Sequence, residues 1–274
     1  MNLIESAYNI ELNDNNKYFL EEIEAKYKDY IKLLETFDEK ALSIFLESLK
    51  KDEIRNNHKT ENEDPLMITF YTSMMENDSL TTLINILHQK DKLTMSDVKK
   101  LHKILMEGTE KDVGAGEFRQ KDVFVGAFNP DGTQRIDYVP IAYDAIEENM
   151  AKVLEIINSN NQDNVFINPF IIHGLIAALQ PFMDGNTRTA RLLQHSKIWT
   201  NTNMLYNKKF ALPTIYLSEN YWRSRGDNRY LINQLAIEEN NEAWNAWFKH
   251  NFYMVDEQLF HLNNVANKAR RKIK

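Results

Sequence analysis

The chain has 274 residues, of which 43% are hydrophobic and 27% are charged, so it is long enough to bury one large core. It has no cysteine, which excludes disulfides and thiolate metal sites and agrees with a cytoplasmic location. A formal charge of −7 argues against general nucleic-acid binding, and no apolar run approaches the roughly 18 residues of a membrane span. The first residues show no signal peptide, and the basic segment 268–274 is typical of a solvated helix end.

Helical periodicity dominates a chain with only eight glycines and six prolines. Residues 17–50 are predicted to form two amphipathic helices, and the polar stretch from Lys50 to Pro65 is predicted to be a linker. We therefore expect an N-terminal helical extension with its linker at 1–65, followed by a helical domain at 66–274. The predicted fold class is mainly α.

One segment breaks the helical pattern. Two β-prone runs, 121–128 and 136–139, flank the turn sequence Asn129-Pro-Asp-Gly132. This arrangement predicts a small hairpin with a longish loop.

The most apolar segment of the chain comes after this hairpin. Asn168 is predicted to cap a helix that has a proline in its first turn. Residues 170–179 are apolar on every face, which is typical of a buried helix at the centre of a domain. That helix is expected to end near Pro181. A second helix is expected to start at about Asn186, with this residue as its cap, and to run to Trp199.

The loop between these two helices has the residues of a phosphate site. Gly185 permits a positive φ, and the first amides of the second helix favour an anion at one point. Arg188 and Arg191 are three residues apart, so they are expected to share a helix face near that point. Asp184 suits a magnesium ion that holds only one or two protein carboxylates. The loop thus predicts a nucleotide phosphate site, although this spacing alone leaves a plain helix–loop–helix equally open.

The segment Gln180-Pro-Phe-Met-Asp-Gly-Asn-Thr-Arg-Thr-Ala-Arg191 resembles the Fic signature His-Pro-Phe-x-(Asp/Glu)-Gly-Asn-(Gly/Lys)-Arg-x-x-Arg. Seven residues fall on signature positions: Pro181, Phe182, Asp184, Gly185, Asn186, Arg188 and Arg191. Residues 121–140 resemble the family's flap, and residues 72–77 resemble its inhibitory motif (Ser/Thr)-x-x-x-Glu-(Gly/Asn). The resemblance extends over residues 66–250. It implies a Fic-type helical bundle with a central buried helix and one small β-hairpin flap.

Fic proteins typically transfer AMP from ATP to a hydroxyl side chain of a target protein. The resemblance therefore implies ATP and magnesium as cofactors, and a target protein or the chain itself as the acceptor. It gives phosphate binding and its support to the signature loop: magnesium to Asp184, phosphate contacts to Gly185, Asn186, Thr187, Arg188 and Arg191, and a core anchor to Phe182. A homo-oligomer is left open.

Two further roles follow from the same resemblance. Thr72, Glu76 and Asn77 would form the inhibitory motif, in which Glu76 pairs with Arg191 and blocks productive ATP binding. The flap would pair with an extended target segment, a form of strand addition that involves Val123, Phe124, Val125 and Tyr138. The alternatives are an exposed helix carboxylate at Glu76 and a hairpin that only covers a corner of the core.

The signature departs from the family pattern at two positions. Gln180 replaces the histidine that removes the proton from the target hydroxyl, and a carboxamide cannot accept that proton. Losing a general base typically costs about 10²–10⁴ in rate. His173 and His195 each lie seven residues from a loop residue, about 10 Å along a helix, so neither is a convincing substitute. Thr187, where Gly or Lys is usual, has a Cβ that disfavours positive φ and can crowd the phosphates.

These departures leave several functions open. One is a protein adenylyltransferase of weak or absent activity. Another is a non-catalytic nucleotide-binding or protein-interaction module on the same fold, and a third is a helical scaffold that has lost nucleotide binding.

Overall fold

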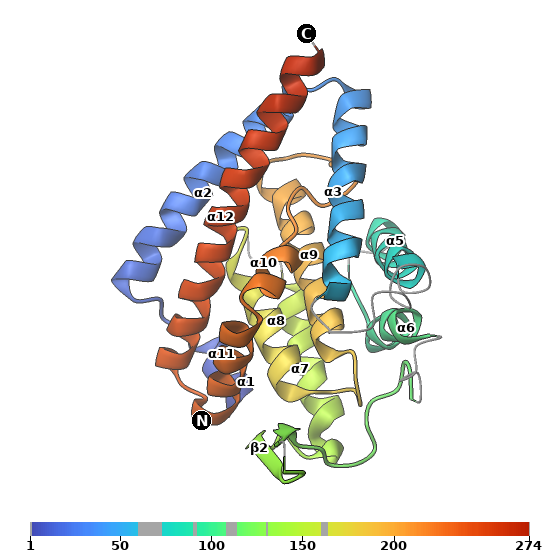
Figure 1. The fold of residues 1–274 in the computed structure, drawn as a ribbon, viewed down its shortest axis with the longest axis vertical. Coiled ribbons are helices and arrows are strands. Elements are labelled where there is room, and N and C mark those ends of the chain that lie inside the picture. Colours follow the sequence, from blue (N-terminus) through green and yellow to red (C-terminus); the bar gives the residue numbers. More distant parts are fainter. Residues whose placement is uncertain are drawn as a thin grey trace.

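The computed structural model describes residues 2–59, 73–89, 92–107, 114–129, 131–159 and 164–273. The fold is mainly α with one two-stranded sheet, as the sequence predicts (Figure 1). The described elements are α1 (Leu3–Tyr8), α2 (Asp14–Leu34), α3 (Glu39–Lys59), α5 (Ser73–Gln89), α6 (Met95–Met106), β1 (Val125–Phe128), β2 (Gln134–Tyr138), η2 (Tyr143–Ala145), α7 (Ile146–Asn158), α8 (Ile167–Leu179), α9 (Asn186–Leu205), α10 (Ser218–Arg223), α11 (Arg225–Glu238) and α12 (Asn241–Ile273).

Helix α8 is the predicted central helix, and every residue from Asn168 to Leu179 is buried. It packs against α7, α9, α11 and α12, which surround it in Figure 1. Gly174 lets α11 and α12 pack closely on α8, because a Cβ there would lie 3.0 Å from both Leu235 of α11 and Trp244 of α12. An apolar helix enclosed on all sides gains its stability from burial of its whole circumference.

The caps of both central helices differ from the prediction. The N-cap residue of α8 is Phe166, which makes no side-chain cap hydrogen bond. The first amides are bound by Asn164 ahead of it, whose Oδ1 accepts from Phe166 N (3.1 Å) and Ile167 N (2.7 Å). Asn168 instead lies inside the helix and donates its side-chain amide to Ser159 Oγ at 2.9 Å. Helix α9 begins at Asn186 as expected, but it continues past Trp199 to Leu205.

The N-terminal helices belong to the same hydrophobic core as the rest of the chain. Helix α2 lies along α12, α1 packs on α8, and α3 packs on α10 (Figure 1). Tyr27 of α2 is completely buried, and its hydroxyl lies 2.8 Å from Thr202 Oγ1 and 2.6 Å from Thr214 Oγ1. The extension is therefore integrated into the fold rather than tethered to it.

The predicted linker from Lys50 is wrong as far as Lys59, because α3 continues to that residue. The stretch consists largely of lysine, glutamate, aspartate and arginine, and lysine, glutamate and arginine are good helix formers even without an apolar stripe. Glu53 provides the contact with the core, since it is only 8% exposed. The boundary placed at residue 65 lies outside the described residues.

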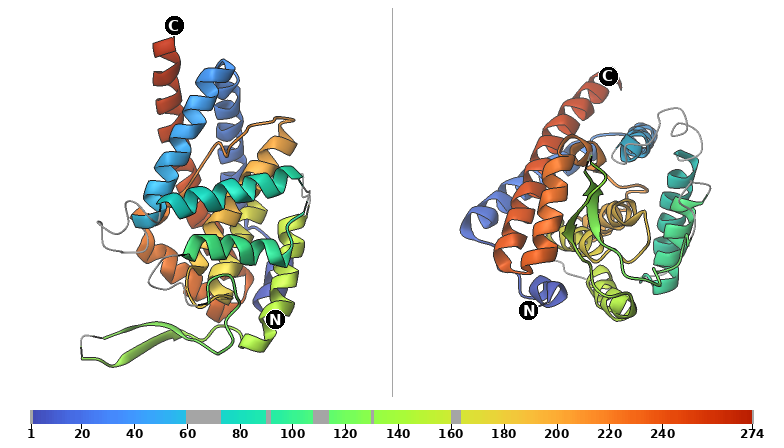
Figure 2. Two further views of the ribbon diagram at one scale, coloured as in Figure 1. Left: turned by 90° about the vertical axis from the view of Figure 1, so that its right-hand side faces the viewer. Right: turned by 60° about the horizontal axis from the view of Figure 1, so that its bottom comes forward.

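The predicted hairpin is confirmed, with β1 and β2 antiparallel. The pairing is irregular between Val125 and Gly126, where a Cβ on the glycine would lie 2.0 Å from the Arg135 carbonyl oxygen. Only glycine allows the two strands to approach so closely at this bulge. The hairpin extends away from the helical body (Figure 2), and its only buried residue within β2 is Tyr138.

Candidate functional site

The loop between α8 and α9 makes its two turns with left-handed residues. Gln180 ends α8 with φ 49° and ψ 59°, and Gly185 precedes α9 with φ 71°. A side chain at Gly185 is excluded twice, by this φ and by a Cβ that would lie 2.5 Å from Met106 Sδ. The loop is thus pressed against α6, with its conformation set by both ends.

Asn186 holds this loop closed rather than capping α9. Its Oδ1 accepts the amide of Phe182 at 2.9 Å, and its Nδ2 donates to the Phe182 carbonyl at 3.0 Å. The same Nδ2 donates to Gln180 Oε1 at 2.8 Å. The predicted cap is therefore wrong in detail, because the cap residue is Gly185 and it makes no side-chain hydrogen bond.

The carboxamide of Gln180 is bonded at both of its ends. Its Nε2 donates to the Ala177 carbonyl at 2.6 Å, and its Oε1 accepts from Asn186. Its backbone oxygen accepts from Arg119 Nε at 2.8 Å, and the backbone amide of Arg119 donates to the Pro181 carbonyl at 3.0 Å. Arg119 is 2% exposed, so this buried guanidinium fastens the base of the flap to the signature loop.

His102 is a loop anchor that the sequence analysis missed. Its Nδ1 accepts the amide of Gly116 at 2.9 Å, so its Nε2 carries the proton and donates to the Asp184 carbonyl at 2.9 Å. The ring also stacks on Phe182, with centroids 3.6 Å apart and planes within 3°. Burial lowers the pKa of His102 to about 4, which keeps the ring in the neutral form that this pattern needs.

A cavity of about 460 Å³ opens beside this loop. It is lined by three residues of the loop and α9 (Gln180, Thr187, Arg191), two of the flap (Val125, Tyr138), and by Ala177, Tyr221, Arg225, Gly226, Asn228, Arg229, Ile232 and Asn233. Three of the lining side chains are arginines. None of the described lining residues is an aspartate, a glutamate or a histidine. The cavity therefore suits an anionic ligand and has no basic side chain of moderate pKa in its wall.

Residues 92–196, which include this loop and one wall of the cavity, match the model of the Fic/DOC family. The chain carries a Fic/DOC domain. The protein adenylyltransferase fic-1 of Caenorhabditis elegans is 28% identical over 109 residues, which are 38% of this chain and 19% of that protein. This chain thus spans about a fifth of the length of that curated relative.

Solved structures share the fold over most of the chain. A Fic family protein from Desulfovibrio desulfuricans superimposes with a TM-score of 0.67 at 16% identity, covering 93% of this chain and 76% of the other. A Fic domain containing signaling protein from Bacteroides thetaiotaomicron gives a TM-score of 0.63 at 15% identity, covering 93% and 97%. The fold of the Fic-type bundle is therefore shared beyond residues 92–196, including the N-terminal helices.

The Fic domain separates the two signature arginines. Arg191 lines the cavity, whereas Arg188 is 1% exposed and points to α6, with its Nη2 3.0 Å from Met106 Sδ. The Nε of Arg188 is buried with no hydrogen-bond partner among the described residues. Both arginines lie on α9 three residues apart, as expected, but their side chains do not face one point, because Arg191 lines the cavity and Arg188 contacts α6.

Asp184 lies at the loop tip, half-buried, and does not line the cavity. Its Oδ1 accepts the amide of Gly185 at 2.6 Å. Among the described residues, no group of three or more histidines, cysteines, aspartates or glutamates could hold a metal ion. A single carboxylate nevertheless fits magnesium, which commonly binds one or two protein carboxylates together with phosphate oxygens.

The remaining predicted residues fall in three places. Val125 and Tyr138 line the cavity. Val123 and Phe124 precede β1 and do not line it; Val123 is half-buried and Phe124 is 46% exposed. Tyr138 is 6% exposed and its hydroxyl donates to the Ala177 carbonyl at 3.3 Å, so it faces the signature loop. Thr72 and the side chains of Glu76 and Asn77 lie outside the described part of the structure.

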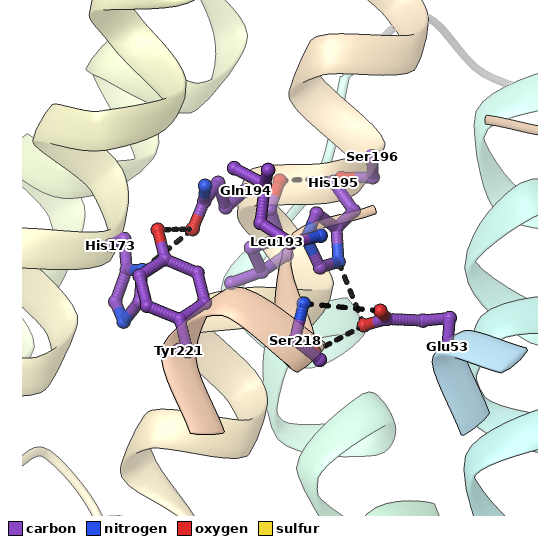
Figure 3. Close-up of polar contacts among 9 residues, drawn as sticks. Glu53, His173, Leu193, Gln194, His195, Ser196, Ser218 and Tyr221 are labelled. Carbon is purple, nitrogen blue, oxygen red and sulfur yellow. Dashed lines mark hydrogen bonds and ion pairs between the residues drawn. The ribbon is translucent and has the colours of Figure 1, made fainter. Parts of the chain in front are cut away.

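His173 and His195 are both buried in polar networks behind the cavity (Figure 3). His173 Nδ1 lies 2.6 Å from Gln194 Oε1, and burial lowers its pKa to about 3. His195 Nδ1 lies 3.2 Å from Glu53 Oε1, and its Nε2 accepts the amide of Leu217 at 3.0 Å. Neither ring lines the cavity, so neither replaces the base that Gln180 lacks.

No helix in the described part of the chain is long and apolar enough to cross a membrane.

Proposed function

We propose that this Fic domain binds the polyphosphate of a nucleotide with magnesium, and that AMP transfer from it is weak or absent. The observation that carries the proposal is the state of Gln180: its carboxamide is bonded at both ends within the loop, beside an arginine-lined cavity. The site has kept its anion-binding residues and has lost its base.

Phosphate binding is supported by charge and by the helix start. Arg191 and Thr187 both line the cavity. Thr187 lies in the first turn of α9, where the helix dipole favours negative charge. Arg188 would complete the site by turning away from Met106, because the Nε of its buried guanidinium has no acceptor among the described residues. Asp184 would hold the magnesium ion, which neutralises phosphate charge when bound.

The weakness of transfer is supported by the chemistry of the groups near Gln180. An amide side chain can position a hydroxyl but has no useful basicity. Two tyrosines, Tyr138 and Tyr221, are among the described residues that line the cavity, and burial raises the pKa of each far above neutrality, so both stay protonated. A target hydroxyl in this cavity would therefore lose about 10²–10⁴ in rate relative to a site with a general base.

The acceptor of any residual transfer is proposed from the flap and from the named relative. A hydroxyl side chain presented along the hairpin, from a target protein or from the chain itself, would reach the cavity past Val125. Glu76 is proposed as the inhibitory carboxylate that competes with phosphate for Arg191. The protein adenylyltransferase fic-1 is similar over 109 residues only, so both roles need direct tests.

Calorimetry with Mg-ATP tests the binding half of the proposal. The full chain and its Glu76→Gly variant are titrated with Mg-ATP. Arg191→Gln and Arg223→Gln are each added to Glu76→Gly and titrated in the same way. Arg223 is the matched control, since it lies on α10 outside the cavity and pairs with Glu219. We expect binding in Glu76→Gly that Arg191→Gln weakens at least about tenfold and Arg223→Gln leaves unchanged. Silence from both wild type and Glu76→Gly would exclude nucleotide binding.

A further inference from the structure

A buried carboxylate from the N-terminal extension lies behind the cavity wall. Glu53 of α3 accepts hydrogen bonds from Ser218 Oγ (2.5 Å) and Ser218 N (3.3 Å), and its Oε1 lies 3.2 Å from His195 Nδ1 (Figure 3). Glu53, His195 and Ser218 are 8%, 2% and 0% exposed. A carboxylate removed from water in this way needs charge compensation as well as hydrogen bonds.

His195 does not supply that compensation. Its Nε2 accepts the amide hydrogen of Leu217, so that nitrogen has no proton of its own, and the ring is a neutral donor toward Glu53. Ser218 is equally neutral. The oxygens of Glu53 therefore accept hydrogen bonds from neutral donors, and its negative charge is not balanced by either of these two residues.

Arg191 is a permanent cation whose charge also acts on Glu53, in addition to the larger effect of the neighbouring His195. It precedes His195 by four residues on α9, so the two side chains are neighbours on one helix face. Although burial raises the pKa of Glu53, the contacts with His195 and Ser218 and the charge of Arg191 bring it below its ordinary value. Arg191 also lines the cavity, so the same guanidinium acts on the buried carboxylate and borders the space for an anion.

We infer that Glu53 is a positioning residue through which the N-terminal extension lowers the affinity of the cavity for anions, by sharing the charge of Arg191 with them. The inference rests on the proposed function for the identity of the anion, but not for the coupling between Glu53 and Arg191. It gives the N-terminal helices a role in the site that is separate from the proposed inhibitory motif, since Glu53 approaches α9 from α3.

The arrangement also explains why the extension is packed so firmly. Glu53 contacts the middle of α9, through His195, and the start of α10, through Ser218. These contacts lie one turn after Arg191 and three residues before Tyr221, and both of those residues line the cavity. The carboxylate thus holds two parts of the cavity wall in place, and its negative charge offsets part of the positive charge of Arg191 in that wall.

The test compares two ligands on three variants of the full chain. Glu53→Gln keeps the size of the side chain and an acceptor for Ser218 but removes the charge, and Glu53→Met removes the same charge if the first variant does not fold. Ser218→Ala, which keeps the charge and removes a hydrogen bond, is the control. We expect Glu53→Gln to bind Mg-ATP on the order of tenfold more tightly and adenosine unchanged, with Ser218→Ala near wild type for both. Unchanged or weaker binding of Mg-ATP, or a parallel change for adenosine, would overturn the inference.

A ligand-free measurement separates this inference from the proposed function. Unfolding of wild type, Glu53→Gln, Arg191→Gln and the double variant is followed in urea. The factor by which each variant raises the unfolding equilibrium constant is measured. If the two charges interact, the factor for the double variant is about five- to tenfold smaller than the product of the factors for the two single variants. If no protein binds Mg-ATP, the proposed function fails, and additivity in this cycle would then independently refute the role of Glu53.

Discussion

Replacement of His102 by phenylalanine separates the two ways in which this residue holds the signature loop. A phenyl ring can keep the stack on Phe182, whose centroid lies 3.6 Å from that of the imidazole. It cannot accept the Gly116 amide or donate to the Asp184 carbonyl, and each of those bonds is 2.9 Å long. Both backbone groups would then lose their hydrogen bond to this ring.

The expected cost of His102→Phe is about 2–4 kcal/mol, because two hydrogen bonds to largely buried backbone groups are lost. The assay is urea denaturation at pH 7.5, read by tryptophan fluorescence, with Lys103→Ala on the exposed side of α6 as the control. Mg-ATP affinity should fall in parallel, since the loop tip loses its anchor. A loss under about 1 kcal/mol with unchanged binding would refute the anchoring role of His102.

Three further outcomes are expected. The rings of His102 and His173 are buried and neutral, with pKa values of about 4 and about 3, so their contribution to stability is complete above pH 6.5 and is lost as the pH falls toward 4. Denaturation between pH 7.5 and 4.5 should therefore show the free energy of unfolding falling with pH, less steeply in His102→Phe. Equal slopes for wild type and His102→Phe would contradict this. Gly185→Ala, at φ 71° and against Met106 Sδ, should cost about 2–4 kcal/mol in the same assay, and a cost under about 1 kcal/mol would speak against the tight loop. Asn186→Ala removes three hydrogen bonds within the loop and should weaken Mg-ATP binding measured by calorimetry, whereas binding at wild-type strength would show that the loop holds its shape without them.

The central helix and the loop could be predicted from local sequence. Residues 170–179 are apolar on every face, which only a buried helix explains, and Gly185 marks the one loop position where a positive φ meets a close neighbour. The hairpin followed from two β-prone runs around a turn sequence. These features depend on a few consecutive residues, so the sequence contains their signal.

The supports of the site could not be predicted in the same way. His102 is 82 residues from Asp184, and Glu53 is 165 residues from Ser218. His102 occupies the apolar face of α6 beside Leu101 and Leu105, which is a signal of burial but not of its partners. The polar stretch after Lys50 predicts a linker, because the inward carboxylate of Glu53 adds no apolar residue to the helical pattern, whereas the structure has α3 there. Long-range polar contacts of this kind leave no pattern in a single sequence.

The caps show how local rules compete. Asparagine is a good cap residue, and the sequence predicts caps at Asn168 and Asn186. In the structure, Asn164 accepts the amides at the start of α8 from a position ahead of the N-cap residue Phe166. Asn168 and Asn186 bind Ser159 and the signature loop. A side chain that can satisfy either its own helix end or a neighbouring segment goes where more buried groups need partners.

The most direct test of the whole account is restoration of the missing base. Glu76→Gly and the double variant Glu76→Gly with Gln180→His are incubated with Mg-ATP labelled at the α-phosphate, and label on the protein is measured. The account predicts that Glu76→Gly gives little or no label and that the double variant labels itself at least about 10²-fold more. Equal labelling of the two variants would contradict the claim that this Fic domain lacks only its base.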